Sequence, residues 1–194
     1  MKHVRLAVAV LLVAVLAVAA ASQAQTKDEG IAKVLIKKTE PRTVAVWKHK
    51  GPYTDMAAVV TKLTGELDKG GHAMAGPVMC MFLTNIETTP AQDLLWQVMI
   101  PVVNPGVFGK VEPDKMGFQY SDAMSVAFTF HVGPYETLNE SYKTLFDWAK
   151  RNQYKVQGFP IEVYWNDPNR TPKEKLVTEI WMPVEEKRVP GIVR

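Results

Sequence analysis

The chain has 194 residues, 23 of them basic and 20 acidic, so its formal net charge is only +3. A surface that binds DNA or RNA needs a clustered basic excess, and this balance argues against a nucleic-acid partner. Cys80 is the single cysteine, which excludes an intramolecular disulfide. His72 and Cys80 have no partner cluster of ligand side chains, so neither a metal site nor a cofactor is expected.

The first residues predict export. Lys2 and Arg5 precede an apolar run of sixteen residues from 6 to 21, and small residues then lead to Ala24. This is the layout of a secretory signal peptide with cleavage after Ala24. A retained membrane anchor is the alternative, but a spanning helix needs roughly 20 residues. We therefore expect a signal peptide at 1–24 and a periplasmic or secreted domain at 25–194 without membrane contact.

The rest of the chain contains a duplication with an offset of 82 residues. The segment 44–53 returns at 126–135 with six identities, and both copies end in His-x-Gly-Pro-Tyr. The same offset relates Gly76 to Gly158 and Pro101 to Pro183. A constant register over such a length predicts two structural repeats, at about 33–103 and 115–185, joined by an ordered linker at 104–114.

Each repeat is expected to run strand, helix, strand, strand. Residues 44–49 and 125–131 are rich in β-branched and aromatic side chains and end in Gly-Pro, as strands do before a turn. Apolar side chains then recur at spacings of 3 and 4 over 53–67 and 135–149, which is typical of one helix face. The remaining strands are expected at 76–83, 94–102, 158–165 and 177–184. The pattern predicts an α/β fold of the α+β type, with two pseudo-symmetric β-α-β-β repeats whose antiparallel sheets are each backed by a helix.

Alternation along the strands predicts which side chains lie under the helices. The set that is apolar in both repeats is expected there: Met79, Met81, Leu83, Val98, Ile100, Ile161, Val163, Trp165, Ile180 and Met182. The opposite set mixes large aromatic rings with carboxylates: Val78, Cys80, Phe82, Gln97, Met99, Pro160, Glu162, Tyr164, Glu179 and Trp181. This second set suits a ligand-binding surface better than a dry core.

Glu179 breaks the repeat symmetry, because its mate in the first repeat is the neutral Gln97. A buried carboxylate is costly unless it is paired or hydrogen-bonded. Beside Trp181 and Tyr164 it would attract a flat or cationic apolar ligand through stacking and a counter-charge. A structural carboxylate, paired with a lysine or a hydroxyl group from another strand, is the alternative.

Together these motifs resemble the GyrI-like small-molecule-binding domain. The resemblance covers about 33–185 and rests on four features: the paired His-x-Gly-Pro-Tyr turns, the Glu162-x-Tyr164 strand, the Asn166-Asp167-Pro168 turn and the segment 178–184. It implies a groove between the repeats that binds apolar, often cationic compounds, with Glu179 as its acidic centre. The expected ligand-binding residues are Glu179, Trp181, Tyr164, Glu162, Phe82, Tyr53 and Trp47. Tyr53 and Trp47 carry over less directly, because the facing of their strand is ambiguous.

The resemblance extends to effector-binding domains of AraC-type and MerR-type regulators and to a gyrase inhibitor, but export would separate this chain from DNA. We therefore predict an extracytoplasmic protein that binds a small molecule. Two alternatives stay open. A hydrolase of strained cyclopropane-bearing compounds would use Glu179 as general base with Tyr164. A haem-binding protein would use His49 and His131 as axial ligands.

Overall fold

The computed structural model describes residues 33–85 and 88–185, so the expected signal peptide lies outside the described residues. The first repeat contains β1 (Leu35–Lys38), β2 (Arg42–Lys50), η1 (Tyr53–Asp55), α2 (Met56–Gly70), β3 (Val78–Phe82) and β4 (Leu95–Pro101). The second contains β5 (Met116–Ser121), β6 (Ser125–Val132), η3 (Tyr135–Thr137), α3 (Leu138–Arg151), β7 (Ile161–Tyr164) and β8 (Val177–Pro183). The predicted order of strand, helix, strand and strand is confirmed in both repeats, and β1 and β5 precede it.

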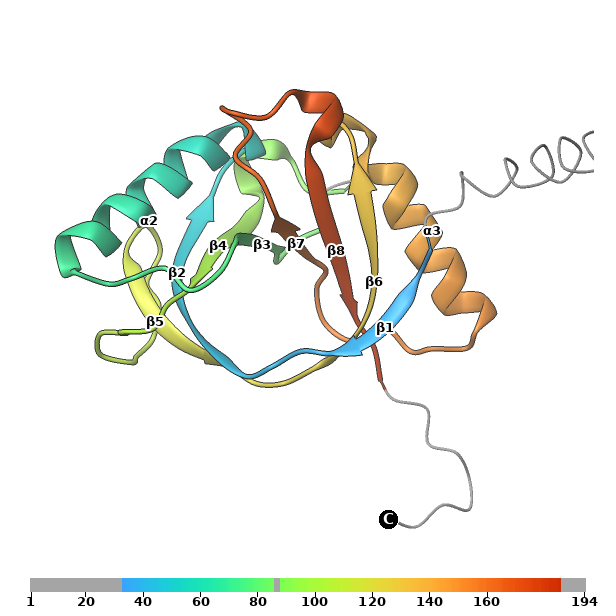
Figure 1. The fold of residues 1–194 in the computed structure, drawn as a ribbon, viewed down its shortest axis with the longest axis horizontal. Coiled ribbons are helices and arrows are strands. Elements are labelled where there is room, and N and C mark those ends of the chain that lie inside the picture. The colour runs from blue at the N-terminus through green and yellow to red at the C-terminus, as the bar shows by residue number, and fades with distance from the viewer. Residues whose placement is uncertain (1–32, 86–87, 186–194) are drawn as a thin grey trace, which may run out of the picture. The chain divides into compact units, whose positions relative to one another are not determined.

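The eight strands form one open antiparallel sheet in the order β1-β6-β8-β7-β3-β4-β2-β5 (Figure 1). The sequence predicts a separate sheet for each repeat, but β3 and β7 pair and join the two. Free strand edges expose unpaired backbone groups, and this pairing satisfies them. Cys80 lies opposite Glu162 in the register, and these residues are repeat mates at the offset of 82. The pseudo-twofold axis therefore passes between Cys80 and Glu162.

The two repeats exchange their first strands. β1 pairs with β6 of the second repeat, and β5 pairs with β2 of the first. The chain segments that follow these strands are joined, because the Thr39 N–H donates to the Met124 carbonyl at 2.8 Å. The Met124 N–H in turn donates to Thr39 Oγ1 at 3.0 Å. Each half of the sheet therefore contains a strand from the other repeat.

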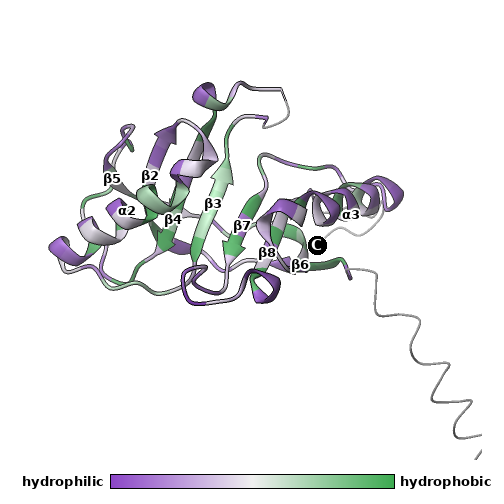
Figure 2. Ribbon diagram, turned by 90° about the horizontal axis from the view of Figure 1, so that it is seen from above, coloured by the Kyte–Doolittle hydropathy of each residue, from purple (hydrophilic) through white to green (hydrophobic). Residues whose placement is uncertain are grey.

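Both helices cover the same face of the sheet, α2 over β2 and β4, and α3 over β6 and β8 (Figure 1). The predicted helical stripes are confirmed by their buried members, Leu63 and Leu67 in α2 and Leu138, Leu145 and Ala149 in α3. In α2 the buried valine is Val59, whereas the predicted stripe contains Val60, which is half-buried. The central strands β3, β4 and β7 are coloured mainly as hydrophobic, whereas α2 and α3 show long hydrophilic stretches (Figure 2). In the described part of the chain, no helix is long and apolar enough to cross a membrane.

The strand register corrects half of the predicted facing. Residues opposite each other share a face, and Cys80 lies opposite both Val98 and Glu162, whereas Glu162 also lies opposite Ile180. We call the side that carries these residues the helix face and the other side the inner face. The helix face carries Val78, Cys80, Phe82, Val98, Ile100, Glu162, Tyr164, Ile180 and Met182. The inner face carries Met79, Met81, Gln97, Met99, Ile161, Val163, Glu179 and Trp181.

The prediction is thus correct for the fourth strand of each repeat and wrong for the third. β3 and β7 are central strands whose side chains are buried or half-buried on both faces, so their burial alone does not distinguish one face from the other. A shift of one residue in register exchanges the two faces completely. Only the pairing with β4 and β8 decides the facing of β3 and β7.

Candidate ligand-binding site

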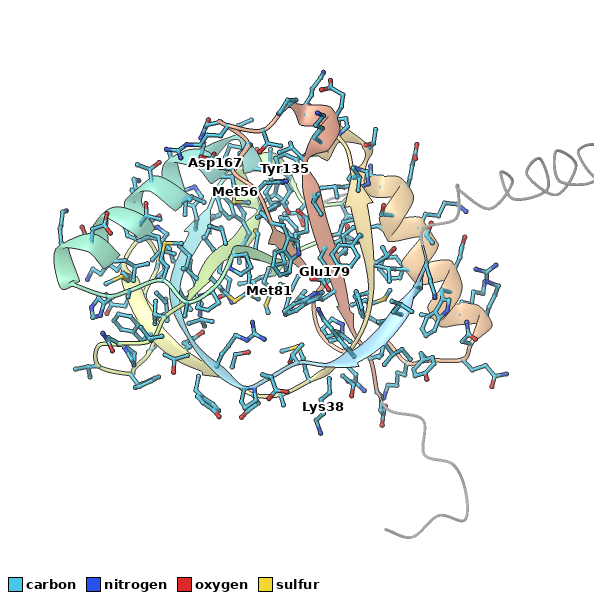
Figure 3. All side chains as sticks on the ribbon, viewed as in Figure 1. Lys38, Met56, Met81, Tyr135, Asp167 and Glu179 are labelled. Carbon is cyan, nitrogen blue, oxygen red and sulfur yellow. The ribbon has the colours of Figure 1, made fainter. Side chains whose placement is uncertain are left out.

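The structure divides the seven predicted site residues between the two faces of the sheet. Glu179 and Trp181 lie on the inner face, where Figure 3 shows Glu179 pointing inside the curve of the sheet. The other five lie on the helix side: Glu162, Tyr164, Phe82, Tyr53 and Trp47. No single site joins all seven, and the expected pairing of Glu179 with Tyr164 is wrong.

Glu179 already has a counter-charge from the chain itself. Its side chain is 1% exposed and forms an ion pair with Lys37 of β1. Trp165 Nε1 donates to the second carboxylate oxygen at 3.2 Å. The Lys37 ammonium also lies 4.4 Å from the centre of the Trp181 ring. Of the two interpretations of this glutamate, the structure supports the carboxylate paired with a lysine on another strand.

Glu162 has no such counter-charge among the described residues. It lies at the centre of the sheet on the helix face and is 5% exposed. The hydroxyl groups of Tyr142 on α3 and Tyr164 on β7 donate to its two oxygens at 2.7 and 2.6 Å. Burial raises the pKa of the Glu162 carboxyl, and the two tyrosine hydrogen bonds lower it in part. Within residues 33–85 and 88–185, the hydrogen bonds to this buried carboxylate therefore come from neutral groups.

Aromatic rings from both repeats surround this carboxylate. Tyr53 and Tyr135 come from the two His-x-Gly-Pro-Tyr turns, and each begins the short helix before α2 or α3. The Tyr53 ring contacts Phe82 with 4.7 Å between ring centres, and the Tyr135 ring contacts Tyr164 at 5.5 Å. We call this cluster the Glu162 site: Tyr53, Cys80, Phe82, Tyr135, Tyr142, Glu162 and Tyr164.

One polar atom of the Glu162 site is buried without a hydrogen bond in the described part of the chain. The Tyr53 hydroxyl is buried and has no hydrogen-bond partner within the described residues. Burial raises the pKa of Tyr53, and the nearby Cys80 and Glu162 raise it further. Tyr135 is 37% exposed, so the cluster extends from the buried carboxylate to the surface. An unbonded buried hydroxyl group costs free energy that a bound ligand or water can recover.

Two residues of the Glu162 site, Tyr142 and Tyr135, are not predicted from the sequence. Tyr142 belongs to the apolar stripe of its predicted helix, where a tyrosine is an ordinary packing residue, and only the fold brings its hydroxyl group to Glu162. Tyr135 is a member of the duplicated turn, and its mate Tyr53 was expected in the site. The repeat symmetry is the one signal that points to Tyr135 as well.

Both ring nitrogens of each histidine in the duplicated turns have hydrogen-bonding partners. His49 hydrogen-bonds Asp114 through Nδ1 at 2.9 Å and Asp55 through Nε2 at 3.1 Å. His131 hydrogen-bonds Ser141 through Nδ1 at 3.0 Å, and its Nε2 lies 3.2 Å from a backbone carbonyl oxygen. The haem alternative thus loses both proposed axial ligands. Over the described residues, no group of three or more His, Cys, Asp or Glu side chains is placed to hold a metal ion.

Comparisons with known proteins identify the fold. EcmrR in a DNA complex has 18% identity and a TM-score of 0.69, over 94% of this chain and 69% of that one. The isolated EcmrR C-terminal domain has 23% identity and a TM-score of 0.66, and the match covers 80% of this chain and 98% of that domain. A hydrolase from Listeria innocua has 12% identity and a TM-score of 0.62, with 84% of this chain and 97% of the hydrolase covered. SAV2435 bound to tetraphenylphosphonium has 14% identity and a TM-score of 0.50, with 79% of this chain and 94% of SAV2435 covered.

At these identities the solved structures establish the shared fold. A comparison with curated proteins found no match. The sequence profile of the GyrI-like small molecule binding domain matches residues 19–185, which is most of the chain. The resemblance inferred from the paired turns and the strand motifs is therefore confirmed, and this chain belongs to the GyrI-like small-molecule-binding domain family.

Proposed function

We propose that this chain is an extracytoplasmic binding protein that takes an apolar, cationic, aromatic molecule at the Glu162 site. One observation carries the proposal: Glu162 is 5% exposed and forms no ion pair within the described residues. An unpaired charge in a low-dielectric interior is expensive, so a cationic ligand gains from supplying the missing counter-charge. Export is supported by the signal-peptide pattern of residues 1–24.

The surroundings of Glu162 favour the same class of ligand. Tyr53, Tyr135 and Tyr164 present aromatic rings, and a cation over such a ring gains further attraction when water is excluded. The rings also offer flat apolar surface for stacking. The tetraphenylphosphonium bound to SAV2435, a similar structure, is a lipophilic cation of this kind and supports its choice as a first probe.

A pair of probes of similar shape tests the proposal. Tetraphenylphosphonium carries the positive charge, and triphenylphosphine oxide is a neutral analogue. Glu162→Gln removes the carboxylate charge and should weaken the affinity for the cation by at least about tenfold, while the affinity for the neutral compound changes little. Isothermal titration calorimetry measures both affinities.

Two further variants complete this design. Glu140→Gln changes an exposed carboxylate on α3 and serves as the matched control. Glu179→Gln tests whether the charge on the inner face is the one that matters. A loss of cation affinity in Glu179→Gln with none in Glu162→Gln would refute the proposal, as would equal losses for the cationic and the neutral probe.

Hydrolysis is a second candidate, favoured by the contact between Glu162 and Tyr164. A carboxyl whose pKa is raised by burial is suited to accept a proton, and the Tyr164 hydroxyl lies 2.6 Å from one of its oxygens. Incubation with strained cyclopropane-bearing compounds, followed by mass spectrometry, separates the candidates. Turnover that disappears in Glu162→Gln favours the hydrolase, and unchanged compound favours a binding protein.

A further inference from the structure

His49 lies between two carboxylates at the start of the first duplicated turn. We call residues 49–55 the first turn and residues 131–137 the second turn. The Nδ1 atom of His49 is 2.9 Å from Asp114 of the linker, and its Nε2 atom is 3.1 Å from Asp55 at the end of η1. A neutral imidazole carries one N–H group, and an ionised carboxylate only accepts hydrogen bonds. The imidazolium form of His49 is therefore the one that donates to both partners at once.

The equivalent histidine of the second turn, His131, has neutral partners. The Ser141 hydroxyl group lies 3.0 Å from its Nδ1 atom, and the Pro134 carbonyl oxygen lies 3.2 Å from its Nε2 atom. A neutral ring with its proton on Nε2 satisfies both of these groups. The repeat mate of Asp55 is Thr137, whose hydroxyl oxygen lies 3.1 Å from the same Nε2 atom. The carboxylates of the first turn are thus not required to build this type of turn.

The two ion pairs of His49 join three segments of the chain. His49 belongs to β2, Asp55 ends the short helix η1 that begins with Tyr53, and Asp114 belongs to the linker. The backbone of Asp114 has a φ of 53°, in the left-handed region that few residues with a Cβ adopt. Its N–H group donates to the Lys48 carbonyl at 2.9 Å, and the hydrogen bond with His49 is the main cause that lowers the pKa of its carboxyl. His49 thus connects an unusual linker conformation to the helix that carries Tyr53.

Further rings and charges surround the first turn. The Tyr53 ring contacts Phe82 at 4.7 Å and Trp96 at 6.0 Å between ring centres, and the Trp96 ring also lies 5.0 Å from that of His49. Lys62 of α2 is a second cause that lowers the pKa of Asp114. Other charged side chains nearby are paired with each other, namely Lys50 with Asp93 and Lys115 with Glu112. Because the Tyr53 hydroxyl has no hydrogen bond in the described part of the chain, the position of its ring follows that of η1.

We propose that His49 is a positioning residue of the Glu162 site: as an imidazolium it holds η1 to the linker and keeps Tyr53 in place, and loss of its proton releases the first turn. Histidine changes its charge between about pH 5 and pH 8. At the acidic end of this range both ion pairs are present. At the alkaline end one ring nitrogen turns a lone pair toward a carboxylate, and repulsion replaces a hydrogen bond. Only the consequence for ligand affinity rests on the function proposed for the Glu162 site.

Hydrogen exchange of the ligand-free chain tests the response of the first turn to pH. Asp55→Thr introduces the residue of the second turn, and a hydroxyl group accommodates a neutral ring. The amides of residues 55 and 56 report on η1, because they donate to the carbonyl groups of Pro52 and Tyr53. Their protection factors in the wild-type chain should fall at least about fivefold from about pH 5.5 to about pH 8.5, because a charge-assisted hydrogen bond is lost. Those of Asp55→Thr and His49→Gln should change little.

Asp93→Asn is the matched control, because it removes a carboxylate that is paired with Lys50 and leaves both partners of His49 intact. It should keep the wild-type response. Glu162 also gains a proton as pH falls, but it is present in every variant and produces no difference between them. A pH response of Asp55→Thr as large as that of wild type, or no response in wild type, would overturn the proposal.

The affinity for tetraphenylphosphonium extends the test to the Glu162 site. Asp55→Thr should bind the cation at least about threefold more weakly than wild type at about pH 5.5, and this difference should disappear at about pH 8.5. Equal affinities of the two proteins at both pH values would overturn the positioning role of His49. Absence of binding at either pH, together with the expected exchange response, would instead refute the function proposed for the Glu162 site, because the exchange measurement needs no ligand.

Discussion

Glu162 and Glu179 are both buried in apolar strands, but their charges meet different surroundings. Glu179 is paired with Lys37, whereas the described residues bond Glu162 only through the hydroxyl groups of Tyr142 and Tyr164. The sequence favours Glu179 because its mate Gln97 is a polar neutral residue of nearly the same shape. The decisive partner, Lys37, is 142 residues away in the chain. The local sequence around the two glutamates does not show which carboxylate has its charge balanced by a lysine.

The raised pKa of Glu162 makes stability depend on pH with a definite sign. The native carboxyl holds its proton above the ordinary value of 4.5, where the unfolded chain has lost it. Between these two values the native state binds more protons, so the contribution of Glu162 to stability is present at acidic pH and is lost as pH rises through the native value. Glu162→Gln should therefore stabilise the chain at alkaline pH, by on the order of 1 kcal/mol.

Urea denaturation of wild type and Glu162→Gln over a range of pH measures this difference. The gain in the free energy of unfolding should shrink as pH falls toward 4.5. Exposed carboxylates such as Glu112 and Asp147 have lowered pKa values, owing to Lys115 and Lys143, but they act equally in both proteins and cancel. A gain that grows toward acidic pH would contradict the account of the buried carboxylate.

Two glycines, one inside helix α2 and one directly after it, test backbone conformation without a change in packing. Gly65 lies in the helix interior and Gly71 follows its end with a φ of 67°, and a Cβ at either position would have no neighbour within 4 Å. Gly65→Ala should stabilise the chain by about 1 kcal/mol, because glycine is a poor helix former. Gly71→Ala should destabilise it by roughly 1–2 kcal/mol, because the left-handed region disfavours a Cβ.

Thermal and urea denaturation of the two variants check this prediction, and each variant is the control for the other. Changes of the same sign in both proteins would contradict the assignment of the left-handed cap. Helix α2 ends at Gly70 and is capped by Gly71, because glycine is the residue that most readily adopts the left-handed conformation of a helix C-terminus.

The sequence predicts those elements whose residue pattern continues over many positions. The helices follow from spacings of 3 and 4, and β2, β4, β6 and β8 follow from runs of β-branched and aromatic residues. β1 has only four residues and β5 contains Gly117, so neither shows an alternation that identifies a strand. Their exchange between the halves is a tertiary feature, because it depends on which edge each strand meets.

The whole molecule is organised about the axis between Cys80 and Glu162. The offset of 82 residues predicts the two repeats, and with them the α+β fold and the duplicated turns. It does not predict the register of β3 against β7, which places the repeat mates Cys80 and Glu162 opposite each other. The pairing of β7 with β8 turns Glu162 and Tyr164 toward the helices, and the register of β3 against β7 brings Tyr53 from the other repeat to the same cluster.

The two repeats differ in charge at the pseudo-twofold axis. A neutral thiol in one repeat faces a carboxylate in the other, and the two turns each contribute a tyrosine near it. Burial raises the pKa of the Cys80 thiol and keeps it neutral, so Glu162 supplies the negative charge of the cluster. A ligand at the proposed Glu162 site would contact both repeats at once, so the proposal accounts for a single binding site in a duplicated fold.

The position of a bound cation tests this account most directly. Tetraphenylarsonium carries an anomalous scatterer at its centre, so a crystal of the complex locates the cation from an anomalous difference map. We expect one strong peak on the helix face, beside Glu162 and among Tyr53, Tyr135 and Tyr164. A peak on the inner face beside Glu179, or a saturated complex without a peak at the Glu162 site, would contradict the account.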